Sequence, residues 1–362
     1  MSERLEVFVT SPWVPPEWIQ AHGLKPRGAW FEETKQPSAV PEGVCGFAQR
    51  LAGLADAHPE AAFVFTTACD QLRRAADAAR ARAHPRAFLF NLPATWQSST
   101  ARRLYHAELT RLGRFLETLG GCSPTDVELE DAIASYESHR ESLRRLLLTA
   151  SARPALEALA ELLNGLTPGL LRGGGSAERR DFSPRTTAAL HVPLALVGGP
   201  LLPAQWALFD VIESVGGSVV LNATEPGERT LLPPLPLTPR RAAGTATRRS
   251  ELLASLANHY FDHAVDVFHR PNTRLYDWLR LRLSERGVRG IVLWVHVGCD
   301  LWRAEAASLR EALALPVLVL EAHEVHAGGL RDTNRLAAFI ESLQPSLQNF
   351  VAPATESCTS AT

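Results

Sequence analysis

Cysteines and long apolar runs are both scarce in this chain of 362 residues. It has five cysteines, an odd and scattered set that does not suit the disulfide framework of a secreted domain. No apolar run approaches the roughly 18 residues needed to span a membrane. The first residues, MSERLEVFVTSPWVPPEW, are charged and then strand-like, without the apolar core of a signal peptide. We therefore expect a protein of the reducing cytoplasm that does not enter a membrane.

An excess of charge of either sign is also lacking. The formal net charge is −2, so no overall field draws the chain to nucleic acid or to an anionic membrane. The sequence contains no Ser-His-Asp, HExxH or CxxC signature, which weakens hydrolase and zinc-protease interpretations. Hydrophobic residues make up 46% of the chain and charged residues 21%, which is typical of a globular protein long enough for two domains.

Apolar runs and helical patterns alternate along two parts of the chain, which are separated by a purely helical part. Between about 100 and 166 the apolar residues recur every 3.6 positions without a strand pattern. On either side, short apolar runs are followed by amphipathic helical patterns, as in a parallel sheet. The expected strands cover 5–10, 61–69 and 86–93 before the helical part, and 190–199, 218–224, 290–298 and 316–323 after it.

This order predicts an α/β fold of two flavodoxin- or Rossmann-like parallel-sheet lobes joined by a helical segment. We place the N-terminal lobe at 1–100, the helical segment and its linker at 101–187, and the C-terminal lobe at 188–343. Residues 344–362 carry no period and are expected to form a disordered tail.

Three cysteines stand where an expected strand gives way to a helix. Cys69 and Cys299 share one pattern, an apolar run followed by Cys-Asp and an amphipathic helix, and Cys45 stands at another expected helix start. In an open α/β sheet this junction is the edge where ligands bind. The two Cys-Asp steps therefore suggest one site assembled from two lobes. Iron–sulfur clusters require soft thiolate ligands, and three thiolates leave the fourth iron of a cubane open to substrate.

The remaining cysteines lie outside this pattern. Cys122 falls in a turn between two helices and Cys358 in the tail, so neither is expected to bind a metal. Free cysteines are often small buried hydrophobes, and that is the alternative for each of the three cysteines at the junctions.

Several polar residues near the same junctions have two interpretations. Asp70 and Asp300 suit the first turns of the following helices, where a carboxylate satisfies free N–H groups. A helix N-terminus close to a thiolate would also lower the pKa of that thiol, which helps cluster ligation. Ser11 is either the N-cap of the helix that follows it or a contact for a substrate thioester. His296 is either a core histidine or a proton relay, and we favour the structural role.

Together these segments resemble the cluster-binding subunits of the 2-hydroxyacyl-CoA dehydratase and benzoyl-CoA reductase superfamily, of the 2-hydroxyglutaryl-CoA dehydratase D-component type. The resemblance covers nearly the whole chain outside the tail. The segments that carry it are SPWVPPEWIQAHGLKP, VCGFAQRL, TTACDQLRR, LVGGPLLPAQWALFDVIESVGGSVV, NATEPGER through Gly227 and Arg229, VGCDLWRAEAASLREALALPVLVLE, and RDTNRLAAFIESL.

The resemblance implies a [4Fe-4S] cluster held by Cys45, Cys69 and Cys299. It also implies an acyl-CoA substrate, a homologous second dehydratase subunit and an ATP-dependent iron–sulfur activator that injects one electron. The substrate thioester would become a ketyl radical anion and expel its hydroxyl group as water. In the aryl-CoA reductase branch, which is the alternative, an aromatic ring is reduced instead.

The chain departs from the family pattern at several positions. Glu225 stands where many members carry Cys, Asn272 follows Pro in place of a common Cys, His323 replaces a frequent Asp, and Ala337 replaces a usual Glu. These departures keep open a non-catalytic homologue that acts as a structural or electron-relay partner. A zinc site made from the same thiolates and a histidine is a third alternative.

Overall fold

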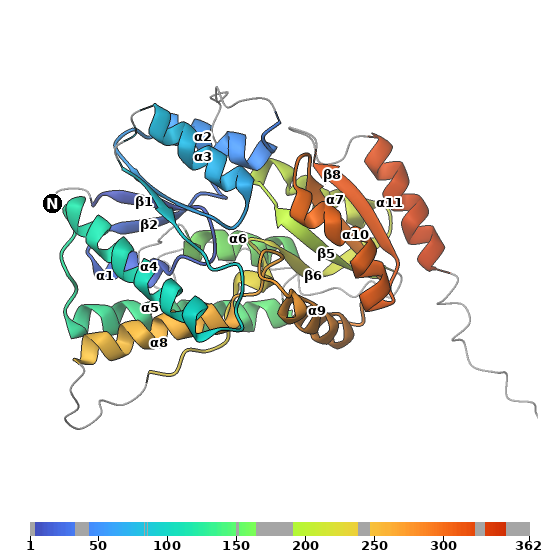
Figure 1. Ribbon diagram of the computed structural model, residues 1–362. Helices are drawn as coiled ribbons and strands as arrows, with labels where there is room; N and C mark the ends of the chain where they lie inside the picture. The colour runs from blue at the N-terminus through green and yellow to red at the C-terminus, as the bar shows by residue number, and fades with distance from the viewer. Residues whose placement is uncertain are drawn as a thin grey trace, which may run out of the picture.

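Two four-stranded sheets, each with all strands parallel, form the framework of the molecule (Figure 1). The computed structural model describes residues 4–32, 43–82, 84, 86–149, 152–163, 191–237, 247–322 and 330–344. The two sheets and their helices confirm the predicted α/β fold of two parallel-sheet lobes with a helical segment.

The N-terminal sheet is sandwiched between helices. Phe63 and Phe65 of its central strand pack under α2 (Gly46–Ala57) and α3 (Asp70–Ala81). Val64, which points to the opposite face, packs against α1 (Pro16–Ala21) and α4 (Ser99–Thr118), because successive residues of a strand face opposite sides. The strand order is β2-β1-β3-β4, with β1 (Glu6–Val9), β2 (Lys25–Gly28), β3 (Ala62–Thr66) and β4 (Ala87–Phe90).

The C-terminal sheet repeats this order with its own strands. One face is covered by α7 (Ala207–Ser214) and α11 (Leu330–Leu343), the other by α9 (Thr273–Glu285) and α10 (Asp300–Leu313). Short 3₁₀ turns, η1 (Pro203–Gln205) and η2 (Glu228–Thr230), follow the first two strands. The order is β6-β5-β7-β8, with β5 (Val192–Pro200), β6 (Gly217–Glu225), β7 (Gly290–His296) and β8 (Val317–Ala322).

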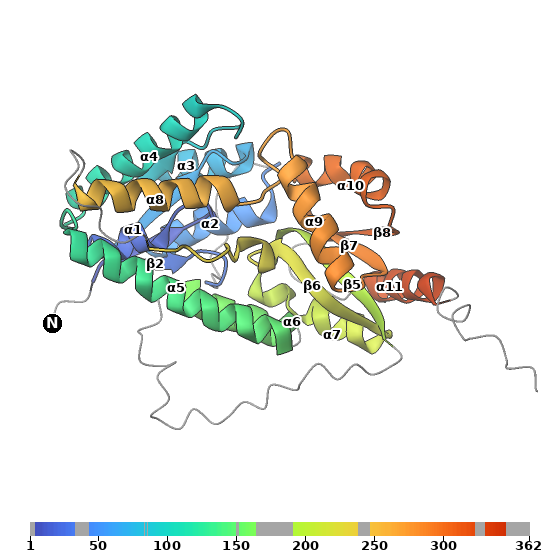
Figure 2. The same cartoon turned by 90° about the horizontal axis from the view of Figure 1, so that it is seen from below.

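A layer of long helices connects the lobes. Its members are α4, α5 (Asp126–Thr149), α6 (Ala152–Leu163) and α8 (Arg248–His263). In the chain α8 comes between β6 and β7, yet it packs on α4 and α5 beside the N-terminal sheet (Figure 2). A buried polar cluster fixes this arrangement, because Arg140 of α5 pairs with Glu17 of α1 at 2.5 Å and the Tyr260 hydroxyl of α8 donates to Glu17 at 2.9 Å.

The two lobes share one apolar core. A single cluster of buried side chains runs from the α2 and α3 side of the first sheet to the α7 and α11 side of the second. Phe31 and Trp206 meet within it, with ring centroids 6.3 Å apart. The lobes are therefore packed against each other rather than held apart.

The sequence did not reveal two of these elements. β2 is a four-residue strand, Lys-Pro-Arg-Gly, without an apolar period, and α8 was not distinguished from the loops around it. No helix in the described ranges has the length and apolar character of a membrane span. The predicted tail from Pro345 onward and His323 lie outside the described residues.

Candidate functional site

A cavity of about 300 Å³ lies where the carboxyl ends of the two sheets meet. In a parallel sheet of this strand order, the loops after the first and third strands diverge, which opens a binding crevice between them. Ser11 and Cys69 follow β1 and β3 at that point in the N-terminal lobe, and Pro200 and Cys299 hold the same position at β5 and β7 in the other. All four line the cavity. Two equivalent crevices therefore face each other and form one site.

The structure brings the three predicted cysteines to this cavity. Each is the N-cap residue of a helix: Cys45 of α2, Cys69 of α3 and Cys299 of α10. Their backbones are extended there, as is usual where a chain enters a helix. Three helix N-termini, each with its partial positive charge, thus point toward one space.

Contacts between loops hold Cys45 in place. Its backbone N–H donates to the side-chain oxygen of Gln71 in the first turn of α3, at 3.0 Å. From the other lobe, Gly298 lies so close that a Cβ added there would be 3.6–3.7 Å from atoms of Cys45. Gly298 has φ +82°, a left-handed conformation that glycine adopts without strain. The α2 start is therefore attached both to α3 and to the β7–α10 turn.

Burial dominates the electrostatics of the thiols. It raises the pKa of Cys69 to about 12 and that of Cys299 to about 11, and it also raises the pKa of Cys45. Backbone amides of the first helical turns act in the opposite direction, so the expected lowering by the helix N-termini is present but outweighed. Cys45 also raises the pKa of Cys69 and of Cys299, and Cys299 raises that of Cys69, since neighbouring thiolates repel. A positively charged occupant would relieve both effects.

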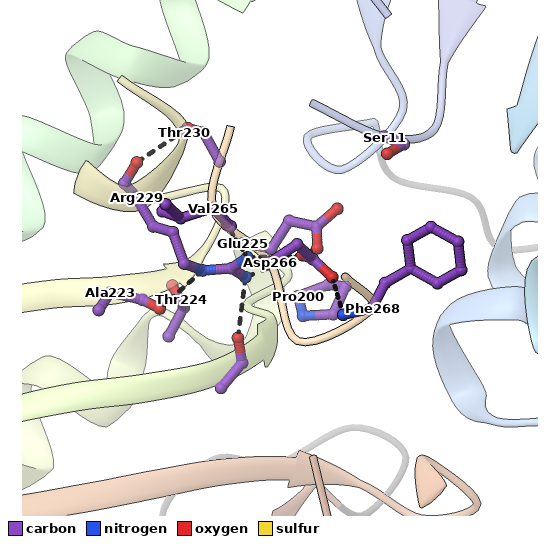
Figure 3. Close-up of polar contacts among 12 residues, drawn as sticks. Ser11, Pro200, Ala223, Thr224, Glu225, Arg229, Thr230, Val265, Asp266 and Phe268 are labelled. Carbon is purple, nitrogen blue, oxygen red and sulfur yellow. Dashed lines mark hydrogen bonds and ion pairs between the residues drawn. The ribbon is translucent and has the colours of Figure 1, made fainter. Parts of the chain in front are cut away.

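A buried acidic cluster faces the same cavity from the C-terminal lobe (Figure 3). Arg229 is fully buried, and its Nη1 donates to Asp266 Oδ2 at 2.6 Å and to the Val265 carbonyl at 2.9 Å. The other Asp266 oxygen accepts from the Phe268 N–H at 2.8 Å. Glu225 is more loosely paired, with Oε2 3.7 Å from Arg229 Nη2.

In the sequence, Glu225 stands out only as a departure from the family pattern, and no motif marks Asp266. The feature that could have identified Glu225 as a site residue is its position at the end of an apolar strand, four residues before Arg229. Burial, reinforced by the neighbouring Asp266 charge, raises the pKa of Glu225 to about 7, although Arg229 and the Trp30 indole act to lower it. A carboxyl group of this kind exchanges protons near neutral pH.

His296 has the structural contacts that we favoured for it. Its buried ring hydrogen-bonds through Nε2 to the Pro200 carbonyl at 2.7 Å, so that nitrogen carries the proton. Burial lowers the pKa of His296, which keeps the ring neutral. The pairing joins the ends of β5 and β7. Gly198 permits their close approach, because a Cβ there would lie 2.0 Å from the Trp294 carbonyl oxygen.

Ser11 lines the cavity, but it is not a helix N-cap as one interpretation required. The helix α1 begins at Pro16 with Pro15 as its N-cap, and the Ser11 hydroxyl accepts from the Trp13 N–H at 3.5 Å. Asp70 and Asp300 are exposed first residues of α3 and α10, one position after the N-caps.

The other cysteines lie apart from the site or outside the described ranges. Cys122 is exposed in the turn between α4 and α5 and is not among the residues that line the cavity. Cys358 lies outside the described residues.

The three thiols do not surround a single point. Within the described part of the chain, no group of three or more His, Cys, Asp or Glu side chains is arranged to hold one metal ion. Zinc requires all of its ligands within about 2.0–2.3 Å of one centre. This arrangement gives the zinc alternative no support, whereas in a four-iron cluster each thiolate binds a separate iron.

Comparison with known proteins adds one finding. A family model described as 2-hydroxyglutaryl-CoA dehydratase, D-component, matches residues 13–343, which is most of the chain. No curated protein matches the chain.

Proposed function

The chain belongs to the 2-hydroxyglutaryl-CoA dehydratase D-component family, and we propose that it is a [4Fe-4S]-dependent subunit of a 2-hydroxyacyl-CoA dehydratase-type enzyme. The family is that of a dehydratase component, which is lyase-like. We further infer a cluster held by cysteine thiolates, an acyl-CoA substrate and a radical route.

One observation supports the proposal above all others. Cys45, Cys69 and Cys299 come from three separate helix starts and line one cavity shared by both lobes. Three thiols close enough for Cys45 to raise the pKa of both Cys69 and Cys299 suit a cationic centre with soft ligands better than they suit an empty space. The donor set and the cavity therefore fit an iron–sulfur cluster held by these three residues.

When bound, the cluster would supply a Lewis-acidic iron without a protein ligand and a one-electron relay at the thioester. The chain itself supplies the enclosure. Apolar parts of Phe47, Leu72 and Trp302 line the cavity and restrict water, while Ser11 offers a hydroxyl to a thioester carbonyl. Exclusion of water strengthens every polar contact that the bound acyl group makes.

Two partners complete the proposal. Reduction of a thioester demands a very low potential, and iron–sulfur clusters reach only about −700 mV at their lowest. We therefore infer that a separate ATP-dependent iron–sulfur activator delivers the electron, and that a homologous second subunit assembles with this one. Location in the cytoplasm stays a prediction.

Metal analysis tests the ligand set. The chain purified without oxygen should contain iron and acid-labile sulfide in equal amounts and little zinc. Single Cys45→Ala, Cys69→Ala and Cys299→Ala variants should each lose most of the iron, and the matched control Cys122→Ala should keep it. Full iron in any of the first three would remove that residue from the site.

Turnover tests the reaction. With activator, second subunit, ATP and a low-potential reductant, the protein should convert 2-hydroxyacyl-CoA to enoyl-CoA only in the absence of oxygen. Reduction of an aryl-CoA ring instead would indicate the reductase alternative. Inactivity with every component present and iron retained would indicate the non-catalytic partner.

A further inference from the structure

Glu225 ends strand β6 at the edge of the cavity that the three cysteines line. Its side chain is 14% exposed, and in Figure 3 its carboxyl end projects from the acidic cluster toward the side on which Ser11 lies. A group bound between the lobes would therefore meet this carboxyl directly.

Asp266, and not Glu225, makes the short ion pair with Arg229. Asp266 takes the short contact with Arg229, at 2.6 Å, and its second oxygen is occupied by the Phe268 N–H. Among the described residues, Glu225 is left with Arg229 at 3.7 Å and with the indole of Trp30. Asp266 is thus a fixed carboxylate, whereas Glu225 retains acceptor capacity toward the cavity.

Other polar groups of the cavity are less suited to proton transfer. The protonated nitrogen of His296 is held by the Pro200 carbonyl, and burial keeps the ring neutral and weakly basic. Asp70 and Asp300 are exposed, so they face solvent rather than an enclosed substrate. The hydroxyl of Ser11 accepts from a backbone N–H and contacts no basic side chain among the described residues.

We propose that Glu225 is the acid–base residue of this cavity, acting on the hydroxyl group and on the neighbouring carbon of a 2-hydroxyacyl thioester. This inference rests on the proposed dehydratase function. The overall dehydration is redox-neutral: the C2–O bond and one C3–H bond break, a C2–C3 double bond forms, and water leaves. As a carboxylic acid, Glu225 gives its proton to the departing hydroxyl oxygen. As a carboxylate, it then takes the C3 proton and returns to its initial state.

The electrostatic surroundings permit both halves of this cycle near neutral pH. Burial raises the pKa of Glu225 to about 7, and the Asp266 carboxylate contributes to this rise, against the pull of Arg229 and Trp30. The charges of Asp266 and Glu225 also contribute to the raised pKa of Cys299. A group with this pKa is present in both forms at neutral pH, which is the best condition for general acid–base catalysis.

A spectroscopic experiment tests the proton without requiring turnover. Infrared difference spectra of the full chain between pH 5.5 and 8.5 should show a buried carboxylic acid that ionises near pH 7, and Glu225→Gln should abolish this signal. Glu108→Gln is the matched control, because Glu108 is also buried but hydrogen bonds to Arg111 and Asn91 lower its pKa below the usual value despite burial. Absence of a Glu225-dependent signal overturns the inference.

Turnover provides the second arm, with the cluster monitored separately. Glu225→Gln should retain iron content and the electron paramagnetic resonance spectrum of the cluster, yet lose about 100-fold or more in the rate of dehydration. Glu225→Asp should recover part of the rate. Wild-type activity in Glu225→Gln would overturn the inference while the dehydratase function stands. Loss of iron in that variant would also overturn it, since Glu225 would then support the metal site. Failure of the proposed function itself appears instead as missing iron in the wild-type chain.

Discussion

The side-chain oxygen of Gln71 accepts a hydrogen bond from the backbone N–H of Cys45 at 3.0 Å. The two residues are 26 positions apart and belong to different helix starts. Through this bond the first turn of α3 fixes the segment that presents Cys45, so two of the three cavity thiols are set relative to each other by a single amide side chain. A misplaced thiolate binds a metal cluster weakly, because metal–sulfur bonds tolerate little change in length.

Gln71→Ala should therefore reduce the iron that the anaerobically purified chain retains, by about 10-fold in affinity, as is typical for residues that orient metal ligands. The measurement is the rate of iron loss to a chelator. Arg74→Ala, an exposed substitution on the same helix, is the control and should behave as wild type. Equal rates in both variants would mean that Cys45 needs no such support.

Removal of Arg229 should destabilise the protein strongly. Arg229→Met leaves the buried Asp266 and Glu225 carboxyls without their cation, and breaking one side of a buried pair costs about 3–5 kcal/mol. Urea denaturation measures the free energy of unfolding. Arg282→Ala removes an exposed pair with Glu285 and should cost less than about 1 kcal/mol. Comparable costs for the two variants would contradict the importance of the buried cluster.

The stability of the protein should also depend on the Glu225 carboxyl in a defined pH range. Its pKa in the folded protein, about 7, exceeds the ordinary value of 4.5. The folded state therefore binds the proton more tightly, so this group's contribution to stability is complete below pH 4.5 and is lost as the pH rises to about 7. The difference amounts to about 3 kcal/mol.

Urea denaturation of wild type and Glu225→Gln between pH 4.5 and 8 isolates this effect. The wild type should lose stability relative to the variant as the pH rises across that window. Burial lowers the pKa values of His259 and His269 to about 4. Their contributions to the stability of the protein are therefore lost in the opposite direction, as the pH falls from 6.5 toward 4. They are present in both proteins and cancel in the difference. A constant difference across the range would show that the pKa of Glu225 is not raised.

Thiol reactivity should separate the cavity cysteines from Cys122 in metal-free protein. With a pKa of about 11, only about one Cys299 thiol in 1,000 is ionised at pH 8, and the fraction is smaller for Cys69. The exposed Cys122 should therefore react with iodoacetamide at least about 100-fold faster than either, as followed by peptide mass spectrometry. In denaturant the rates should converge. Rapid labelling of Cys299 in the folded protein would indicate an ionised thiol.

Most of the fold followed from local patterns in the sequence. The seven expected strands correspond to β1 and β3 to β8, because buried parallel strands have short apolar runs bounded by helical patterns. Cys69 and Cys299 were placed at the carboxyl edge of the sheets because strand-to-helix junctions are visible in the sequence. The repeated Cys-Asp step suggested one site assembled from two lobes, but the cavity itself is set by tertiary packing, since local patterns do not say how two lobes face each other.

The elements that the sequence did not reveal are those defined by tertiary contacts. β2 pairs with β1 although it contains a proline, which an edge strand tolerates. The helix α8 packs on elements more than 100 positions earlier in the chain. The Glu225 environment was equally hidden, because Asp266 lies 41 positions after it (266 − 225) and only folding brings the two carboxyls together.

The return of α8 to the N-terminal side means that the chain passes between the lobes three times rather than once. It crosses after the long helices to enter β5, again after β6 to form α8, and a third time to reach α9 and β7. A hinge motion about one linker is therefore not available, since all three crossings would have to bend together. Truncation after residue 163 would likewise not release a self-sufficient half, because α4 would lose the apolar side chains of α8 with which it shares a core, such as Phe261 beside Tyr105. The two lobes are topologically interlaced, and the cavity between them is a property of the whole chain.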